Sequence, residues 1–277
     1  MLNLPVIVAV GGINSAGRTS GHHAYRRMVL DHLSTVQRRE TEAALAALMD
    51  TTDLQYLRDH TLVRKIESQY FDPAAVNWHR QVTLSADHGP LTFDTGATRS
   101  AEGFPRDWQV QKLDNRKLRV TVDAAPTVLF PSTRQLEVSA AGQLPTGLVP
   151  GDLYASRNHP RALQMTVFAA SDALADLGID WDLVRNRVSP ELISVYVSSS
   201  MGQLDDDGSG GMLRARANGK RVSSKQCPLG FAQMPGDFIN AYLLRSLGKT
   251  GPAMGACATF LYNLQRGVED IRAGRAR

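Results

Sequence analysis

The last stretch of the chain, residues 251–274 (GPAMGACATFLYNLQRGVEDIRAG), constrains the fold more than any other. Residues 253–256 are all small apart from one methionine, and they lead directly into Cys257. The next residues, Ala-Thr-Phe-Leu-Tyr-Asn-Leu, are apolar on nearly every face of a helix. A helix without a polar stripe is normally buried inside a larger protein. The sequence therefore predicts a strand of small residues that turns, at Cys257, into a buried helix.

The predicted position of Cys257 is compatible with two roles. The free N–H groups and the dipole at the start of a helix favour a negative charge. A thiol in such a place ionises more readily and becomes a better nucleophile. A free cysteine is more often a small buried hydrophobe, however. The local pattern alone leaves both roles open for Cys257.

Composition and charge bound the class of protein. With 277 residues, of which 43% are hydrophobic and 21% charged, the chain suits one large globular domain or two small ones. The net charge is +4, and one thin basic cluster stands out: Arg214, Arg216, Lys220, Arg221 and Lys225. A solvated face is its simplest meaning, although an acidic protein or a phosphate-bearing ligand could dock there. No interleaved aromatic residues accompany it, so we do not expect nucleic-acid binding.

The two cysteines, Cys227 and Cys257, have no CxxC or His partner at metal-ligand spacing, so we expect no metal site. So few cysteines in a chain of this length fit a reducing cytoplasm rather than a disulfide scaffold. The apolar start of the chain lacks a basic leader and is short, which favours a first buried strand over a signal peptide. No stretch approaches the roughly 18 apolar residues needed to span a bilayer.

The order of patterns along the chain predicts an α/β fold. Residues 4–10 (LPVIVAV) form a continuous apolar run, typical of a strand buried on both faces of a parallel sheet. Gly11 and Gly12 end this run, but they lack the GxGxxG spacing of a dinucleotide site. Residues 31–50 have the pattern of an amphipathic helix. Within residues 62–80 we expect a short helix that starts at Asp72-Pro73.

The rest of the chain, from residue 81 on, contains both kinds of element. Short β-type runs in residues 81–138 indicate a strand-rich insertion. Residues 161–177 form a strong helix pattern that ends at Gly178. Another buried strand is expected over 192–199, and another helix over 235–247. Such alternation predicts a largely parallel sheet.

Several motifs together resemble the β-ketoacyl-acyl-carrier-protein synthases of the thiolase-like superfamily. The resemblance is strongest in INAYLLRSLGKTGPAMGACATFLYNLQRGVEDIRAG, where a helix, a KTGP turn, a small-residue strand and an ACA turn follow in the family's order. PVIVAVGGINSAGRTSGHHAYRRM, SMGQLDDDGSGG and KQCPLGFAQMPGDFINAY are similar to a divergent bacterial branch with a long early insertion, which starts fatty-acid synthesis. The resemblance covers most of the chain.

The resemblance implies a layered α/β/α/β/α fold and an acyltransferase that needs no metal or organic cofactor. Cys257 would be the nucleophile that accepts the acyl group of an acyl-CoA or acyl-ACP thioester, and malonyl-ACP would then condense with it after losing carbon dioxide. The Cys257 N–H would supply half of an oxyanion hole. Acyl carrier protein would be the partner, and intact family members form homodimers.

The resemblance also implies that the chain corresponds only to the N-terminal half of the fold. The family's catalytic histidines belong to its second half, whereas the seven histidines here lie in the first 160 residues. Residues 1–277 are thus expected to be an incomplete synthase domain, truncated before its last strands. The insertion would cover approximately 31–140, and the nucleophile strand and helix 252–274. An inactive or partner-dependent subunit and a non-condensing acyltransferase remain alternatives.

Overall fold

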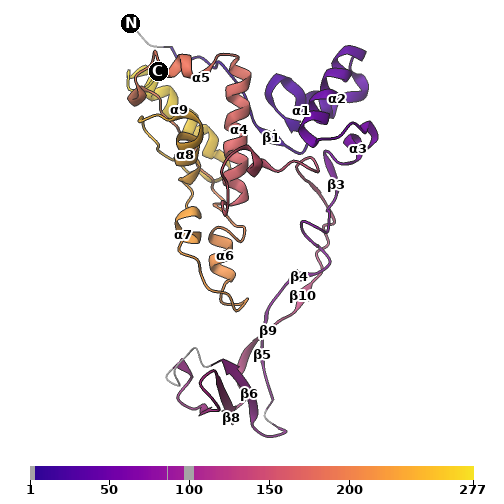
Figure 1. The fold of residues 1–277 in the computed structure, drawn as a ribbon, viewed down its shortest axis with the longest axis vertical. Helices are drawn as coiled ribbons and strands as arrows, with labels where there is room; N and C mark the ends of the chain where they lie inside the picture. The colour runs from indigo at the N-terminus through magenta and orange to yellow at the C-terminus, as the bar shows by residue number, and fades with distance from the viewer. Residues whose placement is uncertain (1–3, 86, 97–102) are drawn as a thin grey trace. The chain divides into compact units, whose positions relative to one another are not determined.

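The computed structural model describes residues 4–85, 87–96 and 103–277, and the chain forms two compact units (Figure 1). The first unit combines the residues up to Ile66 with Ser139–Arg277, and the second is Glu67–Val138. The first unit carries the helices, and the second is built from short strands. The predicted strand-rich insertion over 81–138 lies in the second unit. The resemblance implied a wider insertion, approximately 31–140. The helices within residues 31–66 belong to the first unit, however.

The helices of the first unit are short, apart from three of fourteen to seventeen residues. In chain order they are α1 (His23–Met28), α2 (Thr35–Met49), α3 (Leu54–Asp59), α4 (Arg161–Leu177), α5 (Trp181–Arg185), α6 (Ser209–Arg214), α7 (Gln226–Leu229), α8 (Met234–Ile239) and α9 (Thr259–Arg272). A π-helical turn, Asn240–Leu244, continues α8. The predicted helices over 31–50 and 161–177 are confirmed, and Gly178 ends α4 with φ of 67°.

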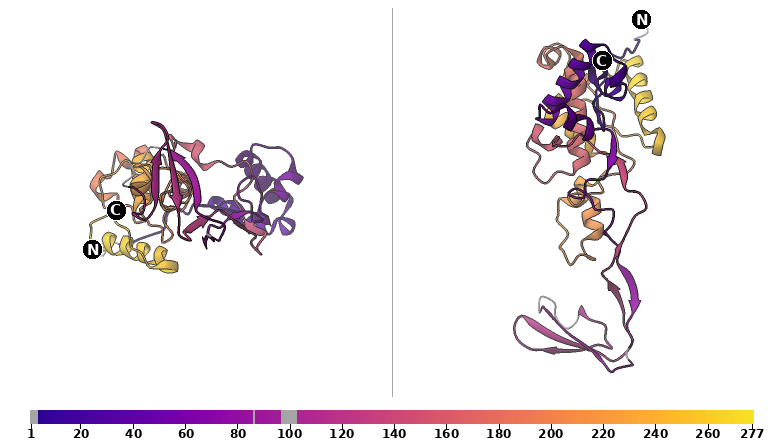
Figure 2. Two further views of the ribbon diagram at one scale, coloured as in Figure 1. Left: turned by 90° about the horizontal axis from the view of Figure 1, so that it is seen from below. Right: turned by 90° about the vertical axis from the view of Figure 1, so that its right-hand side faces the viewer.

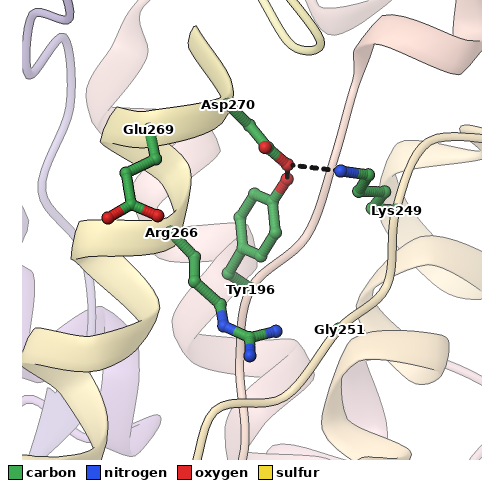
Figure 3. A pocket seen from close by; sticks show the side chains of 6 residues that line it. All are labelled: Tyr196, Lys249, Gly251, Arg266, Glu269 and Asp270. Carbon is green, nitrogen blue, oxygen red and sulfur yellow. Dashed lines mark hydrogen bonds and ion pairs between the residues drawn. The ribbon is translucent and has the colours of Figure 1, made fainter. Parts of the chain in front are cut away.

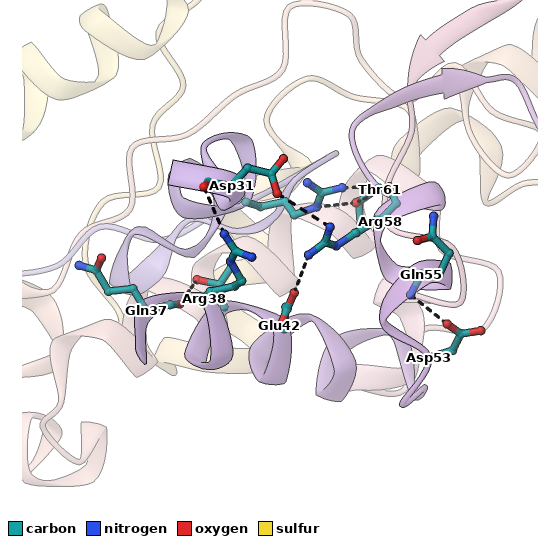
Figure 4. A network of polar contacts seen from close by, with 10 residues as sticks. Asp31, Gln37, Arg38, Glu42, Asp53, Gln55, Arg58 and Thr61 are labelled. Atoms are coloured by element: carbon teal, nitrogen blue, oxygen red, sulfur yellow. Dashed lines mark hydrogen bonds and ion pairs between the residues drawn. The ribbon is translucent and has the colours of Figure 1, made fainter. Parts of the chain in front are cut away.

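Helices α1, α2 and α3 pack around Leu45, Met49 and Leu57, which are at most 4% exposed. A polar network joins the same helices (Figure 4). Arg58 reaches Glu42 at 3.2 Å, while the Arg27 Nε atom donates to Thr61 Oγ1 at 2.8 Å. Because Arg27 is only 8% exposed, its hydrogen bonds compensate for the water that it loses.

The N-terminal segment is attached to α4 through two carboxylates. Asp172, fully buried, accepts hydrogen bonds from the Gly12 N–H at 3.0 Å and the Ser20 N–H at 3.1 Å. Asp176, one turn later, accepts from the Val10 N–H at 3.0 Å. A Cβ atom at Gly11 would lie 2.0 Å from the Ala173 nitrogen, so only glycine allows this close approach.

All strand ladders among the described residues are antiparallel, so the predicted parallel sheet is wrong for this part of the chain. The first unit has two small pairs, β1 (Ile13–Asn14) with β2 (Gly17–Arg18) and β3 (Val63–Lys65) with β11 (Ala140–Gly142). In the second unit β10 (Thr133–Arg134) pairs with β4 (Val76–Asn77), β5 (Arg80–Thr83) with β9 (Thr127–Phe130), and β8 (Lys117–Val122) lies between β6 (Leu91–Gly96) and β7 (Gln109–Lys112).

Leu118, Val120 and Val122 alternate along β8 and are buried, which gives the second unit its small core. The helix predicted to begin at Asp72-Pro73 is wrong, because this segment forms a turn followed by β4. Asp72 accepts from the Ala74 N–H at 2.9 Å, as a helix cap would, but the Pro73 carbonyl accepts from the distant Leu136 N–H at 2.8 Å and not from a following helical turn.

Residues 4–10 do not form the predicted buried strand. Leu4, Ile7 and Val8 are 68–79% exposed, and within the described residues their backbone joins no ladder. An apolar run becomes a strand only where another backbone lies in register beside it, and here the segment is held by the α4 carboxylates instead. None of the described helices is long and apolar enough to cross a membrane.

Candidate active site

The turn that carries Cys257 follows two extended segments that lie side by side. The Val195 N–H donates to the Lys249 carbonyl at 2.8 Å, and Val195 and Thr250 form an isolated parallel bridge. Three residues further along both segments, the Ser198 hydroxyl donates to the Ala253 carbonyl at 2.7 Å. The expected strand over 192–199 is thus reduced to one parallel bridge, because no further backbone pairs with it among the described residues.

Cys257 is exposed, in the middle of a 3₁₀ turn (Ala256–Ala258) that runs directly into α9. Ala256 has φ of 46°, in the left-handed region that residues with a Cβ atom seldom adopt. The Ala258 N–H donates to the Gly255 carbonyl at 2.8 Å and closes the turn. Cys257 therefore lies at the entrance of the helix, as the sequence pattern predicted, and the structure adds that it is exposed.

Two polar side chains of α9 hold this turn. The Thr259 hydroxyl accepts from the Gly255 N–H at 3.1 Å and donates to the Ala256 carbonyl at 2.8 Å. The Asn263 amide accepts from the Ala253 N–H at 2.9 Å and donates back to the Ala253 carbonyl at 3.2 Å. Both side chains belong to buried residues, Thr259 at 9% and Asn263 at 5% exposure.

Sequence reasoning singled out neither Thr259 nor Asn263. A signal was present, because they are four residues apart and interrupt an otherwise apolar run. Side chains with this spacing lie on the same face of a helix. Polar residues on one face of an apolar helix are expected to find buried partners, which here are the backbone groups before Cys257.

A pocket of about 330 Å³ opens beside the turn. Residues 196–200 line one side of it, and Thr259, Phe260 and Asn263 of α9 line the other. Ser198, which forms part of this wall, also accepts a hydrogen bond from the Asn263 amide at 3.2 Å. The residues that fix the cysteine turn therefore also shape a cavity next to it.

The far end of α9 is fixed to the same extended segment through Asp270 (Figure 3). The Tyr196 hydroxyl donates to this carboxylate, Lys249 approaches it at 3.1 Å and Arg275 at 2.5 Å. The hydrogen bond from Tyr196, then those from Lys249 and Arg275, hold the pKa of Asp270 well below its usual range. Burial, with the bond to Asp270, raises the pKa of Tyr196.

The local pattern predicts a buried α9, but this helix is largely exposed in this chain. Phe260, Leu261, Tyr262 and Leu264 are between 43% and 71% exposed, and α9 lies at the periphery of the first unit (Figure 2). The apolar pattern indicates that this face of α9 favours burial, but no described residue covers these side chains fully. An exposed apolar surface of this kind is typical of a face that contacts another protein segment.

The other sequence features that stood out lie apart from the Cys257 turn. Cys227 is exposed in the first turn of the four-residue helix α7. In the basic cluster, Arg214 pairs with Asp206 at 2.6 Å. Across residues 4–85, 87–96 and 103–277, no three His, Cys, Asp or Glu side chains are grouped so that they could hold a metal ion.

Comparisons with known proteins agree with the resemblance. The chain is 46% identical over 301 aligned residues to Beta-ketoacyl-[acyl-carrier-protein] synthase FabY of Pseudomonas aeruginosa, and the alignment covers all of this chain and 48% of that protein. It is 27% identical over 261 residues to Fatty acid synthase 2 of Mycosarcoma maydis, of which it covers 7%. No model of a known protein family matches.

The structure gives the same result. The crystal structure of the ketosynthase FabY from P. aeruginosa superposes with a TM-score of 0.89, over 100% of this chain and 47% of that one. The chain thus spans about half the length of FabY. Over its whole length, this chain is related to the N-terminal half of the β-ketoacyl-acyl-carrier-protein synthases and has the thiolase-like fold of that half.

Proposed function

We propose that the protein works in fatty-acid biosynthesis as a β-ketoacyl-acyl-carrier-protein synthase, with Cys257 as its nucleophile. The observation that carries this proposal is the exposed thiol on a braced turn at the entrance of α9, in a chain related throughout to FabY. Nucleophilic cysteines are typically found in partly exposed places where backbone N–H groups favour the thiolate. The activity belongs to the whole protein, of which the chain corresponds to about half in its relatives.

In the proposed reaction, the Cys257 thiolate attacks the carbonyl carbon of an acyl thioester. The carrier thiol leaves, and the acyl group stays on the sulfur. Malonyl-ACP then loses carbon dioxide, and the resulting carbanion attacks the acyl carbon. The Cys257–acyl bond breaks, which frees the thiolate and gives 3-oxoacyl-ACP. The N–H group of Cys257 would stabilise the negative oxygen of both tetrahedral intermediates.

The partners of this function are acyl carrier protein and an acyl-CoA or acyl-ACP thioester. We further propose a homodimer in the cytoplasm, in line with the resemblance. The exposed side chains of α9, Phe260 and Leu261 above all, offer apolar area that the rest of such an enzyme would cover. Covering one large apolar side chain contributes roughly 1.5–3 kcal/mol.

Selective labelling tests the nucleophile. The purified chain is incubated with an acyl thioester, and the two cysteines are compared by peptide mass spectrometry. Acylation of Cys257 but not of Cys227 supports the proposal, and the Cys257→Ser variant serves as the control. Equal labelling of both cysteines, or labelling only after denaturation, would count against it, because an activated nucleophile must differ from an ordinary exposed thiol.

A second measurement separates condensation from simple acyl transfer. If malonyl-ACP discharges the acyl group and 3-oxoacyl-ACP forms, the protein is a condensing enzyme. Acyl transfer without a malonyl-dependent product would favour a non-condensing acyltransferase. An acylated chain that forms product only after a second polypeptide is added would identify a partner-dependent subunit.

A further inference from the structure

The backbone next to Cys257 needs an external restraint. Ala256 is in the left-handed conformation, which costs a residue with a Cβ atom free energy relative to a helical or extended one. The turn is exposed at Ala256 and Cys257, so packing from the outside does not hold it. The side chains that hold the turn therefore come from α9 and, through Ser198, from the extended segment of residues 196–200.

Thr259 supplies one such restraint, in an unusual way. A hydroxyl that caps a helix accepts from N–H groups further along the chain. The bond from Thr259 to the Ala256 carbonyl is the common back-bond of a helical threonine, but the bond from the Gly255 N–H is not. The Thr259 hydroxyl thus links the Met254–Gly255 peptide to the Ala256–Cys257 peptide, across the strained residue.

Asn263 supplies the second restraint, one turn later. Its amide bonds both the N–H and the carbonyl of Ala253, and the same group donates to Ser198 Oγ at 3.2 Å. Since Asn263 is 5% exposed, breaking these bonds would leave buried polar groups unpaired. The amide therefore fixes the start of the turn to the extended segment of residues 196–200.

We propose that Thr259 and Asn263 are positioning residues, which hold the Cys257 turn in the conformation that acyl transfer requires. This inference rests on the proposed function of Cys257 and goes beyond it. Neither side chain would touch the acyl group in this role. They would act through the backbone, by keeping the thiol and the N–H of Cys257 in one fixed arrangement.

The test compares two reactions of the same thiol. Acylation by acetyl-coenzyme A needs both the sulfur and the N–H in place, whereas alkylation by iodoacetamide needs only an exposed thiol. For Thr259→Val, which keeps the shape but loses the hydroxyl, we expect acylation of Cys257 to fall about tenfold, the rate equivalent of one net hydrogen bond. Alkylation of Cys257 relative to Cys227 should change by less than about twofold. Asn263→Asp, which keeps the acceptor and loses the donors, should act in the same direction.

Matched variants make the result specific. Thr259→Ser restores the hydroxyl and should restore acylation. Thr166→Val makes the same change in α4, where the hydroxyl bonds only the Ala162 carbonyl of its own helix, and should have no effect. Asn240→Asp changes an amide that braces another turn, at Ser246, and should also have no effect.

The outcomes are distinguishable. If wild-type Cys257 is not acylated in preference to Cys227, the proposed function fails, and this inference fails with it. If the wild type is acylated selectively and Thr259→Val is acylated equally fast, only the positioning role is wrong. Parallel loss of acylation and alkylation, or failure of Thr259→Ser to restore acylation, would also overturn it, because either would indicate general disruption of the helix start.

Discussion

Two short segments of small residues, the Gly11 segment (Gly11–Gly12) and the Gly255 turn (Gly255–Ala256), look alike in sequence but are held in different ways. The Gly11 segment lies against the middle of α4, where a Cβ atom at Gly11 would be 2.0 Å from the Ala173 nitrogen. The second precedes α9, where a Cβ atom at Gly255 would be 2.0 Å from the Tyr262 ring. The space beside Gly11 is filled by the backbone of α4. The space beside Gly255 is filled by the Tyr262 side chain, which is 47% exposed.

The side chains that hydrogen-bond to the backbone of the two segments differ in charge. The Gly11 segment is held by carboxylates, since Asp172 accepts a hydrogen bond from the Gly12 N–H and Asp176 accepts one from the Val10 N–H. The Gly255 turn is held by a neutral hydroxyl and a neutral amide, those of Thr259 and Asn263. The difference predicts that the stability of the Gly11 segment depends on a charge and on pH, whereas that of the Gly255 turn does not.

The largest expected effect on stability comes from Asp172, the buried carboxylate that holds the Gly11 segment. Asp172→Asn turns one acceptor oxygen into a donor that faces the N–H groups of Gly12 and Ser20. Because Asp172 is fully buried, we expect a loss of about 3 kcal/mol in the free energy of unfolding, measured with urea. Asp176→Asn, at an exposed residue of the same helix, is the control and should cost less. Equal losses for both variants would contradict a special role for Asp172.

The same carboxylate predicts an acid dependence of stability. Burial raises the pKa of Asp172, but the hydrogen bonds from Gly12, Ser20 and Arg18 outweigh it and leave this pKa below its ordinary value. A lowered pKa in the folded state means that Asp172 stabilises the fold fully above its unfolded value of about 3.9. This stabilisation is lost as the pH falls through the folded pKa. The gap in unfolding free energy between wild type and Asp172→Asn should therefore narrow from pH 6 to pH 3. A constant gap would refute the assignment.

Adding a methyl group at Gly11 and at Gly255 compares directly how tightly the two segments are packed. Gly11→Ala forces a Cβ atom into the α4 backbone, and we expect it to cost about 2 kcal/mol in urea unfolding. The atoms nearest to the new methyl group of Gly255→Ala are those of the Tyr262 ring, which can rotate toward solvent, so the cost should stay below about 1 kcal/mol. The double variant Gly255→Ala with Tyr262→Ala should recover most of that smaller loss. A larger cost for Gly255→Ala than for Gly11→Ala would reverse the comparison.

The elements that the sequence predicts well are those with strong local signals. The helix pattern of α4 and its terminal Gly178 are both local, and the bounds Arg161–Leu177 agree with the prediction. The position of Cys257 at the start of a helix could also be predicted locally. Small residues followed by an apolar helix pattern indicate a turn, whatever the rest of the chain does.

The failures concern features that depend on distant partners. Residues 4–10 and α9 are apolar enough to be buried, but burial needs a covering surface, and no pattern within a segment says whether one is present. The roles of Thr259 and Asn263 were missed for a related reason. Their spacing marks one face of α9, whereas the backbone groups that they bond become neighbours only when the chain turns back at Gly255.

The smallest expected effect on stability concerns Ala256, whose φ of 46° distinguishes the Gly255 turn from an ordinary helix start. Glycine adopts this conformation without the steric cost of a Cβ atom, but it loses more backbone entropy on folding. Ala256→Gly should therefore stabilise the fold by only about a few tenths of a kcal/mol in the free energy of unfolding. At an ordinary helical position the same change destabilises by about 1 kcal/mol. Urea unfolding of Ala256→Gly beside Ala258→Gly, two residues further along, provides the comparison. A loss of about 1 kcal/mol at Ala256 would mean that the left-handed turn does not persist in solution, and with it the reason for a brace at Thr259 would disappear.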